Sequence, residues 1–248
     1  MKFLAIGDIH GRNIWESFAD ISKLMDLSND NYISPEYDKY IFLGDYVDSF
    51  DKTNEEIENN LLKIINFKKL YPDNVILLLG NHDVQYLLNS PWMSNIKYYC
   101  TGYRAEAHFN LYDIFNGNKD LFQLAYQYKN YLFVHAGVHY GWYHFIFNKA
   151  IKNLNLDGLT VAEQLNEAFK IKLDCIFDVD WYRGGRKKVG GPLWVSKELF
   201  SKKPLKNMHQ IVGHTHIDKI KTFKIKDASI TFCDVLTDNL GSYYEIDI

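Results

Sequence analysis

Metal-binding side chains gather in five short blocks of this chain, each of which begins with a run of apolar residues. In chain order the blocks read F-L-A-I-G-D-I-H-G (3–11), Y-I-F-L-G-D-Y-V-D (40–48), V-I-L-L-L-G-N-H-D (75–83), Y-L-F-V-H-A-G (131–137) and I-V-G-H-T-H (211–216). Their carboxylate, carboxamide and imidazole donors suit hard or borderline divalent cations, two of which can share one carboxylate. Five of the nine histidines fall inside the blocks. The pattern therefore predicts metal-assisted hydrolysis at a dinuclear centre.

The apolar runs that begin the blocks predict the strands that position these donors. A continuous apolar run is typical of a strand that is buried on both faces. A small residue after the run, usually glycine, lets the backbone turn sharply at the strand's carboxyl end. Since α/β sheets bind their ligands beyond the carboxyl ends of the strands, the five sets of polar side chains are expected to share one site.

Helices are predicted between the blocks. Apolar residues repeat at helical spacing over 14–25, with Asn13 as the N-cap. Capping-box patterns at Thr53 and Thr160, each with a glutamate three residues later, begin two further helices. The alternation of strand, helix and strand predicts β-α-β crossovers and a largely parallel core.

The ordered set G-D-I-H-G, G-D-Y-V-D, G-N-H-D, V-H-A-G and G-H-T-H resembles the signature of the calcineurin-like metallophosphoesterases. The resemblance is greatest to the phosphoprotein phosphatase and symmetrical diadenosine tetraphosphatase branch, and it covers most of the chain. It implies an α/β fold in which two mixed sheets form a sandwich flanked by helices, with a dinuclear site at the strand carboxyl ends. It also implies two divalent metal ions (Mn, Fe or Zn) and hydrolysis of phosphate esters by a metal-bridging hydroxide.

The resemblance assigns roles to individual residues. The metal positions are Asp8 and His10 for the first ion, Asp45 for the bridge, Asn81, His135 and His214 for the second ion, and His216, which resembles a residue that many members turn back to the first ion. His82 resembles the general acid that protonates the leaving oxygen, and Asp48 resembles its carboxylate partner. Imidazole suits this step because its ordinary pKa lies nearest to neutral pH.

One phosphate-binding arginine of the phosphoprotein phosphatases has no counterpart here. Their pattern continues G-D-x-V-D-R-G, whereas Ser49 follows the second aspartate in this chain. Planar, bidentate recognition of phosphate favours arginine, and the chain has only four. The candidates for its replacement are Arg183 and Arg186, in a glycine-rich stretch where the family places another phosphate-binding arginine, and Arg12, directly after the first block. The alternative for the stretch is a solvated basic loop.

Length and composition limit the other possibilities. A chain of 248 residues with 47% hydrophobic and 24% charged residues is typical of one globular domain, which we expect over 1–248. The net charge of −3 gives no strong signal for nucleic acid as a partner. Three widely spaced cysteines indicate neither a disulfide framework nor a thiolate zinc site. No signal peptide or membrane-spanning run is evident, so we expect a cytoplasmic protein. The oligomeric state stays open.

Two insertions are predicted to interrupt the core, at about 89–128 and 139–181. The first is rich in aromatic residues, and the second begins with aromatics and is mostly helical. Aromatic faces can stack a nucleobase, although helix packing is their commoner use. Lys202, Lys203 and Lys206 are predicted to belong to a solvated loop. Three alternating runs near the end, 219–225, 229–233 and 242–246, predict antiparallel strands at the edge of the second sheet.

The function predicted first is a metal-dependent phosphomonoesterase, or a hydrolase of nucleotides or dinucleoside polyphosphates, with a small phosphorylated substrate. A phosphodiesterase or nuclease is the first alternative, because the G-H-T-H ending and the missing loop arginine suit a diester. A protein serine/threonine phosphatase is the second. A non-catalytic binding module is the third, and it is disfavoured because the unmetallated His82 is retained beside a complete ligand set.

Overall fold

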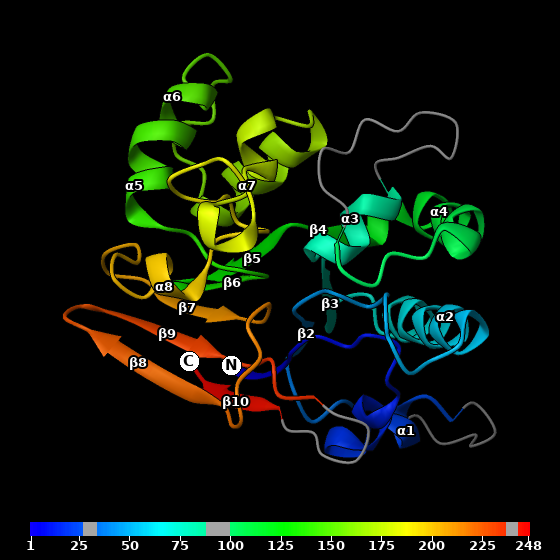
Figure 1. Cartoon of the computed structure of the whole chain (residues 1–248). Helices are drawn as coiled ribbons and strands as arrows, with labels where there is room; N and C mark the ends of the chain where they lie inside the picture. Colours follow the sequence, from blue (N-terminus) through cyan, green and yellow to red (C-terminus); the bar gives the residue numbers. More distant parts are fainter. Residues whose placement is uncertain (27–33, 88–99, 237–242) are drawn as a thin grey trace. The chain divides into compact units, whose positions relative to one another are not determined.

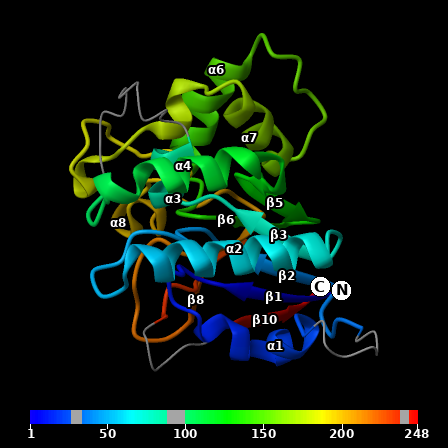
Figure 2. The ribbon, with the colours of Figure 1, turned by 90° about the vertical axis from the view of Figure 1, so that its right-hand side faces the viewer.

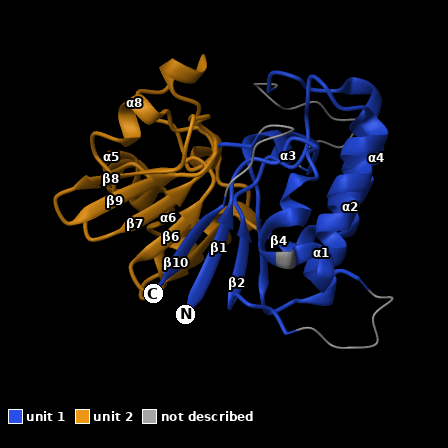
Figure 3. Ribbon diagram, turned by 90° about the horizontal axis from the view of Figure 1, so that it is seen from below, with its two compact units in different colours: residues 1–122, 235–248 blue, residues 123–234 orange. Residues whose placement is uncertain are grey.

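The computed structural model describes residues 1–26, 34–87, 100–236 and 243–248, and the chain divides into two compact units (Figures 1 and 3). Unit 1 comprises residues 1–122 and 235–248, and unit 2 comprises residues 123–234. The described residues form two five-stranded sheets, each mixed in strand direction and accompanied by helices. The predicted α/β class with two mixed sheets and flanking helices is confirmed.

The sheet of unit 1 has the strand order β10-β1-β2-β3-β4. Its parallel strands are β1 (Lys2–Ile6), β2 (Lys39–Phe42) and β3 (Val75–Leu78), while β10 (Tyr244–Asp247) pairs antiparallel with β1 and β4 (Phe122–Gln123) lies beside β3. The apolar runs that begin the first three blocks form these three buried strands, as predicted. Because the strands are parallel, the loops after them leave the sheet at the same edge.

The last strand joins a different sheet from the one predicted. The run 242–246 is predicted at the edge of the second sheet, but β10 pairs with β1 in the first, from Lys2 opposite Asp247 to Ala5 opposite Tyr244. Residue 242 lies outside the described part of the chain. The alternating pattern indicates a half-exposed edge strand, as observed, but it carries no information about which open edge the strand covers.

A layer of helices covers one face of the sheet of unit 1 (Figure 2). The predicted capping box begins α2 (Asn54–Leu70): Glu56 N donates to Thr53 Oγ1 at 3.2 Å, and Thr53 N donates to Glu56 Oε2 at 2.7 Å. Phe67 of α2 then packs edge-to-face on Tyr40 and Phe42, which are two residues apart and so point to the same face of β2.

The helix predicted after Asn13 is irregular. Residues 14–24 form a 3-10 helix, η1 (Ile14–Asp20), and one turn of α-helix, α1 (Ile21–Leu24), and the Asn13 side chain makes no capping hydrogen bond. Within η1 the backbone leaves helical geometry at Phe18 and Ala19, and Ala19 has a φ of 45°. The buried Trp15 donates from Nε1 to Asn60 Oδ1 of α2 at 2.9 Å. This tertiary anchor, which helical spacing cannot reveal, holds the segment.

The remaining helices of unit 1 follow the third block. They are α3 (Asn81–Leu87), η2 (Ala105–Ala107), α4 (His108–Gly117) and η3 (Lys119–Leu121). Residues 88–99, which include Trp92, Tyr98 and Tyr99 of the first predicted insertion, lie outside the described part of the chain.

The sheet of unit 2 has the strand order β5-β6-β7-β9-β8. The strands are β5 (Ala125–Tyr128), β6 (Tyr131–Val134), β7 (His209–Val212), β8 (Lys221–Ile225) and β9 (Ala228–Phe232). Strands β6, β7 and β9 are parallel, and β5 and β8 are antiparallel to their neighbours. The predicted antiparallel pair after residue 216 is confirmed as β8 and β9, but β9 lies inside the sheet, fully buried, rather than at its edge.

Between β6 and β7 the chain of unit 2 forms short helices joined by loops. The elements are α5 (Tyr140–Trp142), one π-helical turn η4 (Tyr143–Phe147), α6 (Asn148–Ile151), α7 (Val161–Lys170), η5 (Asp174–Phe177), η6 (Trp181–Arg183) and α8 (Lys197–Phe200). The predicted capping box at Thr160 begins α7. At α5 the cap is His139, whose Nδ1 accepts hydrogen bonds from Gly141 N at 3.0 Å and Trp142 N at 3.3 Å.

Candidate metal centre

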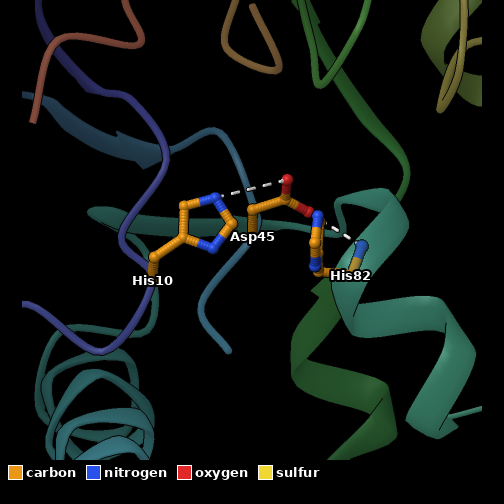
Figure 4. A group of neighbouring side chains, drawn as sticks. All are labelled: His10, Asp45 and His82. Atoms are coloured by element: carbon orange, nitrogen blue, oxygen red, sulfur yellow. Dashed lines mark hydrogen bonds and ion pairs between the residues drawn. The ribbon is translucent and has the colours of Figure 1, made fainter. Parts of the chain in front are cut away.

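The predicted donors of unit 1 lie in the loops that follow its parallel strands. Three side chains converge there: the ligand atoms of His10, Asp45 and His82 all lie within 4.8 Å of one another (Figure 4). His10 Nε2 is 3.9 Å from Asp45 Oδ2, and His82 N donates to Asp45 Oδ1 at 2.9 Å. Asp8, which follows β1, and Asn81, which begins α3, are both buried. This unit therefore brings together His10, a predicted ligand of the first metal, with the predicted bridging carboxylate of Asp45 and the predicted acid His82.

Two backbone carbonyl groups fix the orientation of the His10 ring for metal binding. His10 Nδ1 lies 2.8 Å from the carbonyl oxygen of Asp48 and 3.0 Å from that of Val47. Carbonyl oxygens only accept hydrogen bonds, so Nδ1 must carry the proton and Nε2 must present a lone pair. The Nε2 atom is the one that faces Asp45, as a metal ligand requires.

Cys100 fixes the amide of Asn81 in a similar way. Asn81 Nδ2 donates to Cys100 Sγ at 3.2 Å, and the thiol donates back to the backbone oxygen of Asn81 at 3.3 Å. Burial raises the pKa of the Cys100 thiol, which keeps it neutral. With the nitrogen end of the amide engaged, the oxygen end, Oδ1, is the ligand atom offered to a cation. The cysteine thus orients a donor and is not itself a ligand.

Two glycines allow the second and third loops to pass each other closely. A Cβ at Gly80 would lie 2.1 Å from Asp45 Oδ1, and a Cβ at Gly44 would lie 2.4 Å from Gly80 N. Both distances are far below van der Waals contact, so a larger residue at position 80 would push the Asp45 carboxylate aside, and one at position 44 would push the backbone at Gly80 away. Glycine is needed at position 80 because the carboxylate fills the space of a side chain, and at position 44 because the neighbouring backbone fills it.

The backbone is strained at several of these residues. His10, Asp45, Asp48 and His214 have φ values of 46°, 54°, 61° and 63°, in the left-handed region that non-glycine residues rarely adopt. Each such residue costs on the order of 1 kcal/mol, and such strain concentrates at functional sites.

Asp83 holds the second and third loops together, a role that the sequence pattern does not reveal. Its fully buried carboxylate accepts hydrogen bonds from three backbone N–H groups: Asp45 N at 2.7 Å, Gly80 N at 2.8 Å and Tyr46 N at 2.8 Å. The one sequence signal that could have pointed to Asp83 is that the family pattern G-N-H-E also has a carboxylate at this position. Its partners are main-chain groups, which leave no trace in the sequence.

His82 and Asp48 form the expected pair. His82 Nδ1 is 2.8 Å from Asp48 Oδ2, and the buried Asp48 carboxylate also accepts hydrogen bonds from Gln85 Nε2 and the Tyr86 hydroxyl of α3. The pKa of His82 is raised: burial lowers it, but the charge of Asp45 and the hydrogen bond to Asp48 outweigh burial. Sequence reasoning missed Gln85 and Tyr86, although both lie on the helix that the third block begins.

In unit 2 the fourth and fifth blocks bring two histidines together. His135 follows β6 and His214 follows the adjacent parallel strand β7, and His135 Nε2 lies 3.2 Å from His214 Nδ1. His135 is fully buried. His216 lies two residues beyond His214 with its side chain 60% exposed, and its Nδ1 is 3.6 Å from Asp234 Oδ1. The structure thus groups His135 with His214 and pairs His216 with an aspartate.

The three candidate arginines differ in their surroundings. Arg183 is half-buried, and its Nη2 donates to Thr215 Oγ1, in the G-H-T-H loop, at 2.8 Å. Arg186 is exposed. Arg12 lies in unit 1, with Nη2 3.6 Å from Asp51 Oδ1. Of the two arginines in the glycine-rich stretch, only Arg183 has a recorded contact with a predicted metal-binding block among the described residues.

The loop after Asp48 is held by a fourth arginine. Arg104 donates to the backbone oxygens of Ser49 and Lys52 and, at 2.6 Å, to Asn54 Oδ1. Its own N–H donates to the Tyr86 hydroxyl at 2.9 Å. The missing loop arginine of the family is therefore not replaced by Arg104, which is used to brace this loop.

The donors of the two units fit divalent cations. Carboxylate oxygens, an amide oxygen and imidazole nitrogens form a mixed oxygen and nitrogen set, and the ring of His10 and the amide of Asn81 present their ligand atoms. The sequence model of the calcineurin-like phosphoesterases matches residues 1–218. The chain belongs to the calcineurin-like phosphoesterase family. Residues 1–218 are therefore a calcineurin-like phosphoesterase domain, and its histidine and aspartate groups could hold the divalent metal ions that such domains use.

Relatives of this phosphoesterase are protein phosphatases. Human serine/threonine-protein phosphatase 5 is 38% identical over 82 residues, which are 33% of this chain and 14% of that protein. The serine/threonine-protein phosphatase C23G10.1 of Caenorhabditis elegans is 31% identical over 119 residues, 48% of this chain and 23% of that protein. The chain thus spans less than a quarter of these curated relatives. The matches support the phosphoprotein phosphatase branch.

Solved structures show the same fold. The cold-active protein-tyrosine phosphatase of a psychrophilic Shewanella species has a TM-score of 0.62 and 16% sequence identity, over 98% of this chain and 74% of that one. At this level of identity the likeness concerns the fold alone. Among the helices that the structure describes, we find none with the length and apolar character needed to span a membrane.

Proposed function

We propose that this phosphoesterase acts on small phosphorylated compounds, either as a phosphomonoesterase or as a hydrolase of nucleotides or dinucleoside polyphosphates. The observation that carries the proposal is the His82–Asp48 pair, with Nδ1 and Oδ2 2.8 Å apart, beside Asp45. The pair supplies an acid that is held in position by a carboxylate. Such an acid is needed where the leaving group is a poor one, such as the alkoxide of a natural phosphate ester.

The proposed ligands of the two cations come from five loops. They are Asp8, His10, Asp45 and Asn81 of unit 1, and His135, His214 and His216 of unit 2. When bound, two such cations supply an activated water and neutralise charge on the phosphoryl oxygens. Their identity is part of the proposal, with Mn, Fe and Zn as the candidates.

His82 is proposed to deliver the proton. Its Nδ1 is held by Asp48, so the proton that leaves for the substrate oxygen comes from Nε2. Gln85 and Tyr86 both donate hydrogen bonds to Asp48, which hold its carboxylate in place. The carboxylate therefore fixes the tautomer of the ring and stabilises its cationic form until the proton is transferred.

Arg183 is proposed to bind the phosphate. One of its nitrogens, Nη2, is used by Thr215, and its buried Nε has no hydrogen-bond partner among the residues that the structure describes. A buried N–H without a partner costs about 1–3 kcal/mol, which a phosphate oxygen would recover. Arg186 and Arg12 are the weaker candidates, since one is exposed and the other lies beside Asp51.

The residue Ser49 supports a small or bridged phosphate as substrate. Its hydroxyl donates to Asp51 Oδ1 at 2.5 Å, and the side chain is buried. A buried serine leaves more room and less positive charge than the arginine of the family pattern. An esterified phosphate oxygen carries no charge of its own, so it needs no cationic partner at this position. It is also less crowded beside serine than beside arginine.

A second candidate function is a protein serine/threonine phosphatase, which the local identity to such enzymes favours. Trp181 and Tyr182, each 61% exposed in the stretch that carries Arg183, are side chains that a peptide could contact. A panel of nucleotides, dinucleoside polyphosphates and phosphopeptides separates the two candidates. Fast turnover of phosphopeptides without turnover of any nucleotide would refute the first.

The assignment of His82 is tested with His82→Asn. We expect kcat on an alkyl phosphate to fall by roughly 10²- to 10⁴-fold, the usual contribution of a general acid. On an aryl phosphate the loss should be much smaller, because a phenolate leaves without a proton. Metal content should stay at the wild-type level, and the exposed His144→Asn serves as the matched control. Equal losses on the two substrates would rule out His82 as the acid.

A further inference from the structure

Unit 2 contains a second cluster of cations, which the phosphoesterase chemistry does not use. A cavity of about 320 Å³ is lined by Tyr140, Lys202, Lys203, Pro204, Lys206, Ile225, Lys226, Asp227 and Ala228. Four lysines and one aspartate thus surround it, and we call it the lysine pocket. Sequence reasoning treated three of these lysines as a solvated loop, because their fourth partner, Lys226, lies on another strand pair.

The lysine pocket lies away from the paired histidines of unit 2. Its walls are the segment that leads into β7 and the turn between β8 and β9 (Figure 1). Strands β7 and β9 are parallel, with His209 opposite Ser229, so these walls meet at the amino ends of both strands. His214 follows the carboxyl end of β7. At about 3.3 Å per residue, the strand separates the two places by on the order of 15 Å.

Both walls of the pocket are anchored to the fold. Pro204 and Leu205 are buried, and Tyr140 N donates to the backbone oxygen of Lys203 at 2.8 Å. On the other side, Ile225 pairs with Ala228 across a two-residue turn. The four lysine side chains are exposed, but the backbone that carries them is fixed. The backbone of the pocket is therefore formed before a ligand binds, and the ordering cost that remains is that of the lysine side chains.

Within the part of the chain that the structure describes, the lysines have no neutralising partner. Among the described residues, none of the four forms an ion pair with a carboxylate, and Asp227 is the one acidic residue that lines the pocket. Lys206 Nζ instead lies 5.4 Å from the centroid of the Tyr140 ring. Lysines held around one cavity repel one another, so an anion bound among them is favoured by all four.

Size and shape limit the kind of anion. A volume of about 320 Å³ is at the lower end of the range for small-molecule sites, roughly 300–1,000 Å³. The Tyr140 ring is in contact with His144, with centroids 4.3 Å apart, and with Lys206, which disfavours stacking of a base. Lysines bind phosphate as point charges without the planar geometry of arginine. We propose that the lysine pocket binds a compact polyphosphate group, either a free anion or the phosphate tail of a nucleotide.

The probe for a test is imidodiphosphate, a P–N–P analogue of diphosphate that resists hydrolysis. The full protein, in excess Mg²⁺, is titrated while the backbone amide signals of Lys203, Lys206, Lys226 and Ala228 are followed by NMR. We expect saturable shifts at these amides. A second titration uses the β,γ-imido analogue of ATP: tighter binding than imidodiphosphate identifies the nucleotide tail as the ligand, and equal binding identifies the free anion.

Charge reversals give the decisive comparison. The double change Lys203→Glu with Lys206→Glu, and the single change Lys226→Glu, should each weaken the binding at these amides by about tenfold or more, because an attraction becomes a repulsion. Lys224→Glu makes the same change of charge on an exposed residue of β8 that does not line the pocket, and it should weaken binding less than about twofold. The corresponding changes to glutamine keep the size of the side chain and should show intermediate losses.

Three results would overturn the proposal. The first is a set of shifts that do not saturate, which indicates general attraction to a basic surface. The second is equal weakening by Lys224→Glu and by the pocket variants. The third is binding of orthophosphate as tight as that of imidodiphosphate, which indicates a site for one phosphate group. None of these outcomes depends on turnover, so the lysine pocket can fail while the phosphoesterase assignment stands.

Discussion

Asp83→Asn tests whether one buried carboxylate maintains the loops that carry the predicted bridging ligand. In the wild type, Oδ2 accepts hydrogen bonds from Asp45 N and Gly80 N, and Oδ1 accepts one from Tyr46 N. The amide of asparagine keeps one oxygen for the first two donors, but its NH₂ group then faces the N–H of Tyr46. One hydrogen bond is lost, and two lose the assistance of a full charge.

The magnitude follows from these three contacts. A hydrogen bond to a charged group is worth about 1.5–3 kcal/mol, and a buried donor without a partner costs a similar amount. Asp83 and Asp45 are both acidic and close, so removing one charge returns part of the loss. We expect a net destabilisation of about 2–4 kcal/mol, which lowers Tm by roughly 4–16 °C in a chain of this size.

The assay is thermal unfolding in the presence of a chelator, so that bound metal does not contribute to stability. Asp38→Asn is the matched control, because the exposed Asp38 accepts one backbone hydrogen bond, from Lys2 N at 2.7 Å. It should change the free energy of unfolding by less than about 0.5 kcal/mol. A Tm of Asp83→Asn within about 2 °C of wild type would refute the reasoning.

Three further predictions concern the metal centre, the phosphate and pH. Asp45→Asn should lower the content of both metals together, because the proposed bridge serves both ions; elemental analysis that shows the loss of one metal only would contradict the bridge. Arg183→Ala should lower kcat/KM for a monoester by an amount that corresponds to ~2–3 kcal/mol of transition-state stabilisation, whereas Arg186→Ala should change it little. Equal effects of the two substitutions would contradict the choice of Arg183. Burial and the nearby Lys203 lower the pKa of His139, against the opposing charge of Asp180, so the folded state binds its proton less well than the unfolded state. The stability that this cap provides is therefore present above the ordinary imidazole pKa and is lost as pH falls below about 6.5. The variant His139→Asn keeps an acceptor at the cap, so it should lose less stability than the wild type between pH 7 and pH 5 in denaturant titrations. Parallel losses in the two proteins would show that His139 does not titrate in this range.

Local signals predicted much of the fold. The apolar run of β3 and the capping box at Thr53 act through residues that are neighbours in sequence, and both have the structure expected of them. The His82–Asp48 contact was also expected, because the family resemblance carries the pair as a unit. What these signals share is that each partner has a recognisable side chain.

Contacts to the backbone over long separations were not predictable. Asp83 binds the amide of Asp45, 38 residues away, and Arg104 binds the carbonyl of Ser49, 55 residues away. Every residue but proline offers both of these main-chain groups, so their use leaves no mark in the sequence. The sheet chosen by β10 was missed for the same reason, since the ladder that it joins is made of main-chain atoms.

The pairing of β10 with β1 has a consequence for the order of folding. Residues 2–5 of unit 1 find their partners at 244–247, nearly the full length of the chain away, while all strands and helices of unit 2 lie within one continuous stretch, 123–234. Closing so long a loop carries a large entropic cost, and contacts of high sequence separation form slowly. During synthesis, unit 2 has its complete sequence while unit 1 still lacks an edge strand. The sheet that carries Asp8, Asp45 and Asn81 is therefore finished last, when the final residues of β10 become available to cover β1.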